Sequence, residues 1–187
     1  MSCLSWSDKE DLPLPDWAKF GLGKWRKTEA SNVQQLLAII DQAYNRQSWH
    51  GTNLRGSLRQ VSAGQAAWRP GRQRHNIWEI VVHAAYWKYV VRRRLTGEAR
   101  GSFPIKGSNW FQRPQDSSES AWQADLTLLD QFHQSMRDVI AALPTSELDQ
   151  TLAGSKTSNF ALISGIAAHD LYHAGQIQLL KRLSQTR

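Results

Sequence analysis

The sequence predicts an all-α protein, a four-helix bundle with a long crossover connection between its second and third helices. The first observation behind this prediction is periodicity, because apolar residues recur at the three- and four-residue spacing of amphipathic helices along the chain. The second is size, because 187 residues with 41% apolar composition suit one hydrophobic core and are few for two. The third is a single long connector, residues 98–116, rich in Gly, Pro, Asn and Ser.

The first predicted helix begins after Ser31, a suitable N-cap with Gln34 three residues on to complete a capping box. The apolar positions that follow share one helical face: Val33, Leu36, Leu37, Ile40, Ala43 and Tyr44. This helix is expected to fade near residues 49–51. Residues 53–61 then form a short helical or irregular piece, which leads to a Pro-Gly turn at residues 70–71.

The second predicted helix opens at Asn76, a candidate N-cap, with Glu79 in its first turn. Gly97 is a natural terminator for it, because glycine readily adopts the left-handed conformation that ends many helices. The third helix is expected to start at one of the two serines at 117–118. It should stop at the Leu-Pro pair at 143–144, since the residue before a proline disfavours helical geometry.

The fourth predicted helix runs from about Ser158 to Leu183. Antiparallel neighbours in a bundle usually need connections of only about 2 to 8 residues. The longer connector at 98–116 therefore predicts a crossover, after which the second and third helices run parallel. We assign residues 31–187 to the bundle domain and residues 1–30, with three tryptophans among prolines and glycines, to an N-terminal extension packed on it.

Charge and composition limit the partners. The formal net charge is +7, but the densest basic run, residues 92–94, lies near a predicted helix end, where cations complement the helix dipole, so a nucleic-acid partner is not expected. The single cysteine excludes an intrachain disulfide and a cysteine-based zinc site. No apolar run approaches the roughly 18 residues of a membrane span, so we expect no membrane partner and a cytoplasmic location.

Two of the six histidines, His169 and His173, are four residues apart in the fourth predicted helix, in the stretch HDLYH. A helix of 3.6 residues per turn places both on the apolar face that contains Leu162, Ile166 and Leu180. Buried imidazoles without partners are costly, whereas a metal ion uses one nitrogen of each ring and a neighbouring acceptor the other. The spacing therefore favours a metal chelate over a purely structural role.

A catalytic metal site usually has three protein ligands and one open position, so a third ligand is required. In the second helix, His83 lies on one face with Glu79, Trp87 and Val90 and is the other imidazole centred in an inward stripe. We therefore predict a divalent metal bound by His83, His169 and His173. HDLYH also resembles the HExxH motif of zinc proteases, but no His, Asp or Glu follows His173 to complete such a site.

Two further residues are candidates for catalysis. Glu79 could accept a hydrogen bond from a ligand, act as a general base, or only place a charge at the helix N-terminus. Gln176 could orient a ligand or bind substrate. Asp170 points away from its neighbour His169, which indicates a structural or inter-helix contact, and Gly175 is expected to permit close helix approach.

The remaining candidates are weaker. For His50 and His75 we expect capping or surface roles, and for His133 a place on a helix face outside the site. Four aromatic residues either pack in the core or line the mouth of a pocket: Tyr86, Trp87, Trp110 and Tyr172.

The chain resembles the DinB/YfiT-like family of metal-binding four-helix bundles. The resemblance lies in HNIWEIVVHAAYW, AAHDLYHAGQIQLLKR and, more weakly, Trp49-His50-Gly51, and it extends from about Ser31 to Leu183. It implies the same ligands, His83, His169 and His173, together with a long crossover and a homodimer. It also implies a divalent ion, Zn or Ni in the first place and Fe or Mn in the second.

Some members of the family are S-transferases that use low-molecular-weight thiols, and others are described as metal-dependent hydrolases. The resemblance therefore implies a metal-dependent enzyme that acts on a small-molecule substrate, in one case with a thiol as co-substrate. A three-histidine site suits both reactions, because the ion keeps its full charge and stabilises either a hydroxide or a thiolate. The alternative is a non-catalytic module in which the metal stabilises the bundle and the basic surface binds an anionic partner.

Overall fold

A computed structural model describes residues 31–151 and 155–185, and every regular element in these two ranges is a helix. The elements are α1 (Asn32–Tyr44), α2 (Leu54–Ser57), α3 (Ala63–Ala67), α4 (Ile77–Thr96), α5 (Glu119–Ala141), the 3₁₀ helix η2 (Thr145–Glu147) and α6 (Asn159–Gln185). The all-α prediction is therefore confirmed. The predicted packing of residues 1–30 lies outside the described residues.

Most helix ends lie where the sequence predicts them. Ser31 and Gln34 form both hydrogen bonds of a capping box at the start of α1. Asn76 caps α4 by accepting a hydrogen bond from the backbone N–H of Glu79. Gly97 ends α4 with a φ of 72°, which is the left-handed conformation that glycine adopts without strain.

Two predictions about the region between α1 and α4 need correction. Helix α1 ends at Tyr44, before the predicted residues 49–51, because the backbone N–H groups of Asn45 and Arg46 both turn back to Asp41. Helix α3 was not predicted from the sequence. Its N-cap Ser62 accepts a hydrogen bond from the N–H of Gln65, three residues on, and this serine–glutamine spacing is a signal that was present.

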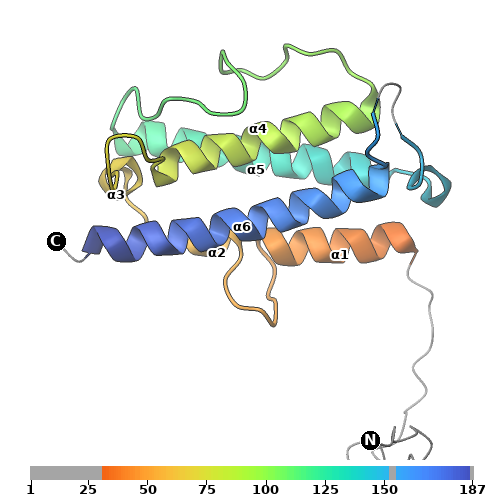
Figure 1. Cartoon of the computed structure of the whole chain (residues 1–187), viewed down its shortest axis with the longest axis horizontal. Helices are drawn as coiled ribbons and strands as arrows, with labels where there is room; N and C mark the ends of the chain where they lie inside the picture. Colours follow the sequence, from red (N-terminus) through yellow and green to blue (C-terminus); the bar gives the residue numbers. More distant parts are fainter. Residues whose placement is uncertain (1–30, 152–154, 186–187) are drawn as a thin grey trace, which may run out of the picture.

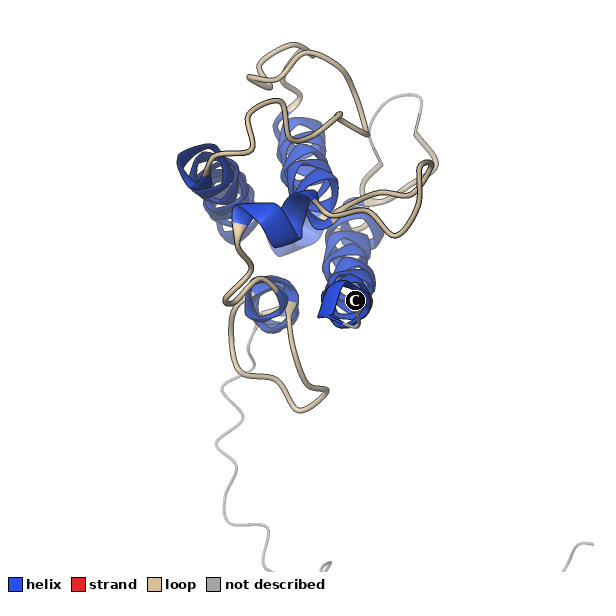
Figure 2. Cartoon of the chain, turned by 90° about the vertical axis from the view of Figure 1, so that its left-hand side faces the viewer, coloured by secondary structure: helices blue, strands red, loops and turns tan. Residues whose placement is uncertain are grey.

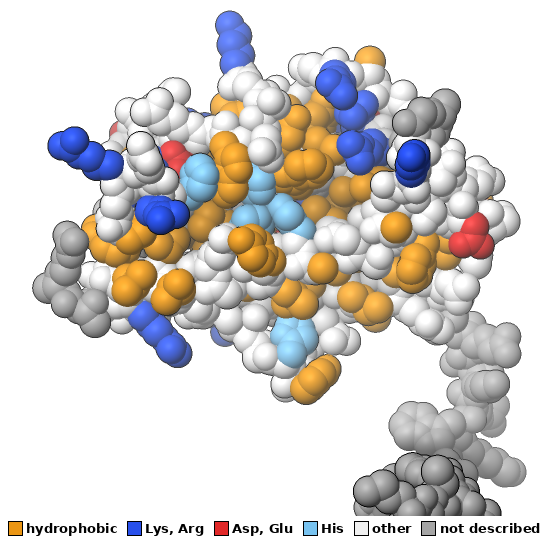
Figure 3. All heavy atoms as spheres, viewed as in Figure 1, with side chains coloured by type: hydrophobic (Ala, Val, Ile, Leu, Met, Phe, Trp, Pro, Cys, Tyr) orange, Lys and Arg blue, Asp and Glu red, His pale blue; other side chains and the backbone are white. Residues whose placement is uncertain are grey.

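The four long helices pack side by side, with the connections outside them (Figures 1 and 2). Two ring contacts show that α4 and α5 run in the same direction. Near the start of both helices, the ring centroids of Trp78 and Trp122 are 5.1 Å apart. Further along both helices, those of Tyr89 and Phe132 are 5.8 Å apart. Figure 1 shows the connection between α4 and α5 leaving one end of the bundle and returning over α4 to the other end. Histidine side chains reach the surface near the middle of the face in Figure 3.

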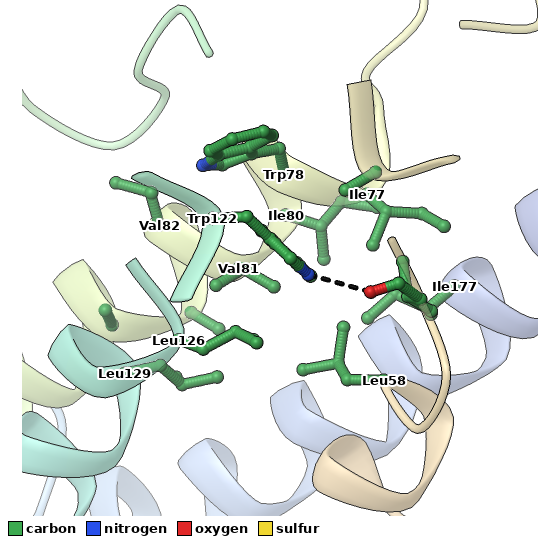
Figure 4. Packing of buried hydrophobic residues seen from close by; sticks show 14 of the residues in the cluster. Leu58, Ile77, Trp78, Ile80, Val81, Val82, Trp122, Leu126, Leu129 and Ile177 are labelled. Atoms are coloured by element: carbon green, nitrogen blue, oxygen red, sulfur yellow. Dashed lines mark hydrogen bonds between the residues drawn. The ribbon is translucent and has the colours of Figure 1, made fainter. Parts of the chain in front are cut away.

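The buried apolar side chains of residues 31–151 and 155–185 form two clusters. The larger one surrounds the indole rings of Trp78 and Trp122, both about 1% exposed or less, and includes residues from the α2–α3 region (Figure 4). Both indoles are hydrogen-bonded, Trp78 Nε1 to Asp125 Oδ2 at 2.6 Å and Trp122 Nε1 to the Val61 carbonyl at 2.8 Å. These bonds satisfy polar atoms that would otherwise be costly to bury. The second cluster joins α1 to α5 and α6.

A buried ion pair connects α4 and α6. Lys88 Nζ donates to both carboxylate oxygens of Asp170 at 2.6 Å, and their side chains are 0% and 1% exposed. The predicted inter-helix role of Asp170 is confirmed. None of the helices in the described ranges combines the length and hydrophobicity needed to cross a membrane.

Candidate metal centre

Helices α4 and α6 bring the imidazoles of His83, His169 and His173 into one cluster. His169 Nε2 lies 3.1 Å from His83 Nε2 and 3.1 Å from His173 Nε2. Ligand nitrogens of all three residues lie within 4.8 Å of one another. Two members come from successive turns of α6 and one from α4, as the helical periodicity of the sequence predicts.

Two of the three rings are oriented through their other nitrogen. His83 Nδ1 donates to the backbone carbonyl of Asn109 at 2.7 Å, and His173 Nδ1 donates to Gln176 Oε1, also at 2.7 Å. A carbonyl oxygen can only accept, so each Nδ1 carries the hydrogen and leaves a lone pair on Nε2. The side-chain amide of Gln176 is held in turn, because its own Nε2 donates to the hydroxyl of Tyr172 at 3.0 Å.

The rings are held in their neutral form. Burial lowers the pKa of His83, even though the hydrogen bond to the Asn109 carbonyl acts against this shift. Burial, followed by the neighbouring His173 and His83, lowers the pKa of His169 to about 3, and burial with His83 lowers the pKa of His173 to about 4. All three imidazoles therefore present unprotonated nitrogens at neutral pH, the form in which histidine binds metal.

This donor set fits a divalent ion. With metal–nitrogen bonds of about 2.0 to 2.1 Å and tetrahedral angles, two ligand nitrogens are roughly 3.3 Å apart. The two 3.1 Å separations at His169 are close to this value. Without an ion, a single hydrogen on His169 Nε2 could satisfy only one of its two contacts with His83 and His173, and the buried Nδ1 of His169 has no hydrogen-bond partner among the described residues.

Aromatic rings form the walls of the cluster. The Trp110 ring stacks on His83 with centroids 3.9 Å apart and planes 10° apart. The Trp87 ring centroid lies 6.3 Å from that of His83 and 6.1 Å from that of His169. Tyr172 is 65% exposed and lies beside His173, at a centroid distance of 5.1 Å. Trp87, Trp110 and Tyr172 thus surround the histidines, while Tyr86 packs against the hydrophobic core.

Glu79 lies one turn before His83 but faces a different set of partners. Its carboxylate accepts hydrogen bonds from Arg69 at 2.5 and 2.8 Å and interacts with His75 Nδ1 at 2.9 Å. Burial raises its pKa, but the bonds from Arg69 and His75 outweigh this effect and lower it overall. The His75 ring stacks on the opposite side of Trp110 from His83, with centroids 3.6 Å apart. Glu79 is therefore connected to the cluster through stacked rings.

The other predicted residues are distributed as follows. His50 is exposed, and His133 is buried in α5, where it stacks on Tyr44 at 3.5 Å, away from the cluster. The expectation for Gly175 was wrong, because a Cβ built there would meet no atom of another described helix within 4 Å.

Sequence reasoning missed Asn109 and Arg69. Asn109 has a φ of 64°, and it accepts from Trp87 Nε1 through its side chain at 3.0 Å as well as from His83 through its carbonyl. Asparagine is one of the few residues other than glycine that adopts this conformation readily, which is the only local signal in the sequence. The connector has no helical period, so the directions of its side chains could not be derived.

Comparison with known proteins identifies the family. The family model described as the DinB superfamily matches residues 46–177, well over half of the chain. No curated protein and no solved structure matches the sequence. The matched range includes α4, the connector and the part of α6 that carries both histidines. With its helical bundle and three-histidine cluster, this chain belongs to the DinB superfamily.

Proposed function

We propose that the protein binds one divalent metal ion through Nε2 of His83, His169 and His173 and is a metal-dependent enzyme, either a thiol S-transferase or a hydrolase. The observation that carries this proposal is the convergence of three neutral imidazoles, with two Nε2 contacts of 3.1 Å. Among the described residues, no carboxylate, thiol or further histidine joins the group. Three protein ligands with a free position are typical of catalytic rather than structural sites.

The ion would supply Lewis acidity, through which a water molecule or a thiol loses its proton near neutral pH. The residues of the chain provide the rest. Asn109 and Gln176 fix the orientation of two ligand rings by accepting their Nδ1 hydrogens. Trp110 covers one face of His83 and excludes water from that side.

Glu79 and Gln176 have different proposed roles. Gln176 lies at the edge of the cluster, joins His173 to the exposed Tyr172 and is placed to contact a substrate. Glu79 is ionised and held by Arg69, so we assign it a positioning role, in which it fixes His75 against Trp110. The proton-accepting role that the sequence left open for Glu79 is disfavoured, because a carboxylate with a lowered pKa is a weak base.

Zn or Ni is the proposed ion, with Fe and Mn as alternatives, because imidazole nitrogen binds several of these borderline metals well. A homodimer is proposed from the family resemblance. Tyr172, Leu179 and Leu183 are 65%, 59% and 42% exposed on α6 and would supply its apolar surface. Sedimentation velocity at micromolar concentration measures the oligomeric state directly.

The central experiment is metal analysis of protein purified without a histidine tag. Wild-type protein is expected to contain one equivalent of a transition metal, and His169→Ala none, because two nitrogens rarely hold such an ion through purification. His50→Ala is the matched control, since this histidine is exposed and outside the cluster. A His169→Ala protein that keeps one equivalent would contradict the proposal.

The reaction is tested with the metal-loaded protein and two substrate sets. A thiol with an electrophilic acceptor tests S-transfer, measured as loss of free thiol, and activated esters and amides test hydrolysis. Activity that is lost in His169→Ala and kept in His50→Ala supports an enzyme. A metal-loaded protein inactive on both sets, with a fourth protein ligand in its crystal structure, would instead support the non-catalytic bundle.

A further inference from the structure

We propose that the cavity between α4 and the connector is a binding site for a small organic anion, with a carboxylate or phosphate group attached to an apolar or aromatic body. The cavity has a volume of about 590 Å³, which suits a molecule of metabolite size. Its cationic residues are Arg93, Arg94, Arg100 and Lys106, and its aromatic residues include Tyr86, Trp87 and Phe103.

The part of the chain that the structure describes places positive charge around this cavity without an acidic side chain in the lining. The nearby Glu98 carboxylate is paired with Arg92, which is not part of the lining, and Arg93 donates a hydrogen bond to the backbone carbonyl of Glu98. Cations that share a concave site without a counter-charge attract an anionic ligand.

Stabilisation of a helix end explains the presence of only two of these four cationic residues. Arg93 and Arg94 lie in the last turn of α4, where positive charge is stabilised by the helix dipole. Arg100 and Lys106 belong to the connector, have no helix end to complement and are exposed. Their presence in the same cavity as the α4 arginines is therefore better explained by a shared ligand.

Much of the rest of the lining is aromatic or aliphatic. The Phe103 ring packs against Tyr86 at 5.3 Å, Tyr89 at 5.5 Å and Phe132 at 5.1 Å between centroids. This contact network fixes the connector against α4 and gives the cavity a preformed aromatic wall. Such a wall favours a ligand with an apolar body over a free inorganic anion.

The cavity adjoins the histidine cluster. Trp87 and Asn109 line it, and these are the residues whose ring and carbonyl contact the histidines. In Figure 3, hydrophobic side chains lie between the histidines and a group of Lys and Arg side chains on the same face. A ligand whose acid group is bound by the cations would thus extend its other end toward the histidines. That last step rests on the proposed function, whereas the anion site itself does not.

Isothermal titration calorimetry with matched probes tests the inference. 1-Naphthyl phosphate and 1-naphthoate share an aromatic body with neutral 1-naphthol, and inorganic phosphate has the charge without the body. At least one of the two naphthyl anions is expected to bind at least tenfold more tightly than 1-naphthol and than inorganic phosphate. The better of the two identifies the acid group. Equal affinity of 1-naphthol and both anions would overturn the proposal.

Variants locate the site. The double variant Arg100→Gln/Lys106→Gln is expected to weaken binding of the preferred anion at least tenfold. The control is Arg72→Gln/Lys156→Gln, which removes the same charges at exposed positions outside the cavity and should change affinity less than twofold. Equal affinity in the two double variants would overturn the proposal. Far-ultraviolet circular dichroism confirms that both variants are folded.

His169→Ala separates this inference from the proposed function. The variant is expected to lose the metal and to retain binding of the naphthyl anion. If the anion no longer binds, its site is the ion rather than the cationic cavity, and the inference fails while the metal proposal stands. If the variant retains its metal, the proposed function fails, but the affinity for the anion still tests the cavity.

Discussion

Helices α4 and α6 are joined by two polar clusters, one fully buried and one partly buried, that differ in how their hydrogen-bonding groups are satisfied. In one, Lys88 and Asp170 form two hydrogen bonds of 2.6 Å and exclude solvent. In the other, directly beside it in sequence, His169 faces His83 and His173 nitrogen to nitrogen. The first cluster is complete within the protein, whereas the second has more nitrogen lone pairs than hydrogens to fill them and could hold a cation.

This difference distinguishes a polar pair that joins two helices from a polar cluster that is proposed to bind an ion. Burial lowers the pKa of Lys88 and raises that of Asp170, and in each case the partner's charge acts against the shift. Burial lowers the pKa of all three clustered histidines, and no acidic side chain in the described ranges joins their group. In the ion pair, each charge thus stabilises the charged form of the other residue. The histidines, in contrast, stay neutral and available as ligands.

The largest effect is expected from breaking the ion pair. Lys88→Met leaves the Asp170 carboxylate buried without a counter-charge and should lower the free energy of unfolding by about 3 to 5 kcal/mol. Lys88→Met/Asp170→Leu should recover most of this loss, because no charge then remains to be buried. Urea unfolding at pH 7 measures both, and a double variant as unstable as the single one would contradict a structural role for the pair.

Adding metal tests the other half of the comparison. An ion that binds only the folded protein should raise the free energy of unfolding by about 2.7 kcal/mol at a free concentration one hundred times its Kd. Thermal unfolding of metal-free protein with added Zn²⁺ measures this gain. It should be absent in His173→Ala and present in Lys88→Met/Asp170→Leu. Equal gains in wild type and His173→Ala would show that the ion binds elsewhere.

A third buried polar group sharpens the contrast, because His133 belongs to neither cluster. Burial, with the charges of Lys88 and Arg137, lowers its pKa to about 2, from an ordinary value of about 6.5. The unfolded chain therefore takes up a proton below about pH 6.5 that the folded protein does not, and stability is lost as the pH falls. At pH 5 this amounts to about 2 kcal/mol.

His133→Gln should remove this dependence. The loss of unfolding free energy between pH 7 and pH 5 is expected to be smaller in the variant than in wild type by about 2 kcal/mol. Urea titrations of both proteins at the two pH values give the difference. Identical pH dependence would mean that His133 takes up its proton in the folded state.

The smallest effect concerns the orientation of one ligand. Gln176→Leu removes the acceptor of the His173 Nδ1 hydrogen and should weaken metal affinity about tenfold or more. Tyr172→Phe is the control, because it removes the hydroxyl bound to Gln176 and leaves the bond to His173. Competition with a coloured chelator measures both affinities. Equal affinity of Gln176→Leu and wild type would show that the α6 backbone alone fixes the ring.

Helical periodicity predicted much of the fold and of the candidate site. The faces of the second and fourth predicted helices place His83 and His173 inward because apolar neighbours recur on the same side, and caps such as Ser31 and Gly97 are local signals. The sequence predicted only one member of the Lys88–Asp170 pair. Asp170 indicated a contact between helices, but its partner is 82 residues earlier in the chain and depends on how α4 and α6 are aligned.

The irregular segments on either side of α4 were the least predictable parts. Asn109 and Arg69 lie in segments without a helical period, so neither the carbonyl that orients His83 nor the guanidinium that binds Glu79 could be placed from spacing. Their roles follow from tertiary packing, which brings two separate segments to the start and middle of α4. Sequence patterns describe faces of helices well and the paths of irregular segments poorly.

His169 and His173 are one turn apart on a single helix, whereas His83 is 86 residues away from His169 in sequence. If these nitrogens share an ion, any separation of α4 from α6 divides its ligands two to one. The rate at which a bound ion exchanges with a labelled isotope would then report how often the two helices part. Metal exchange at this site would then measure the rate at which the helix bundle opens locally.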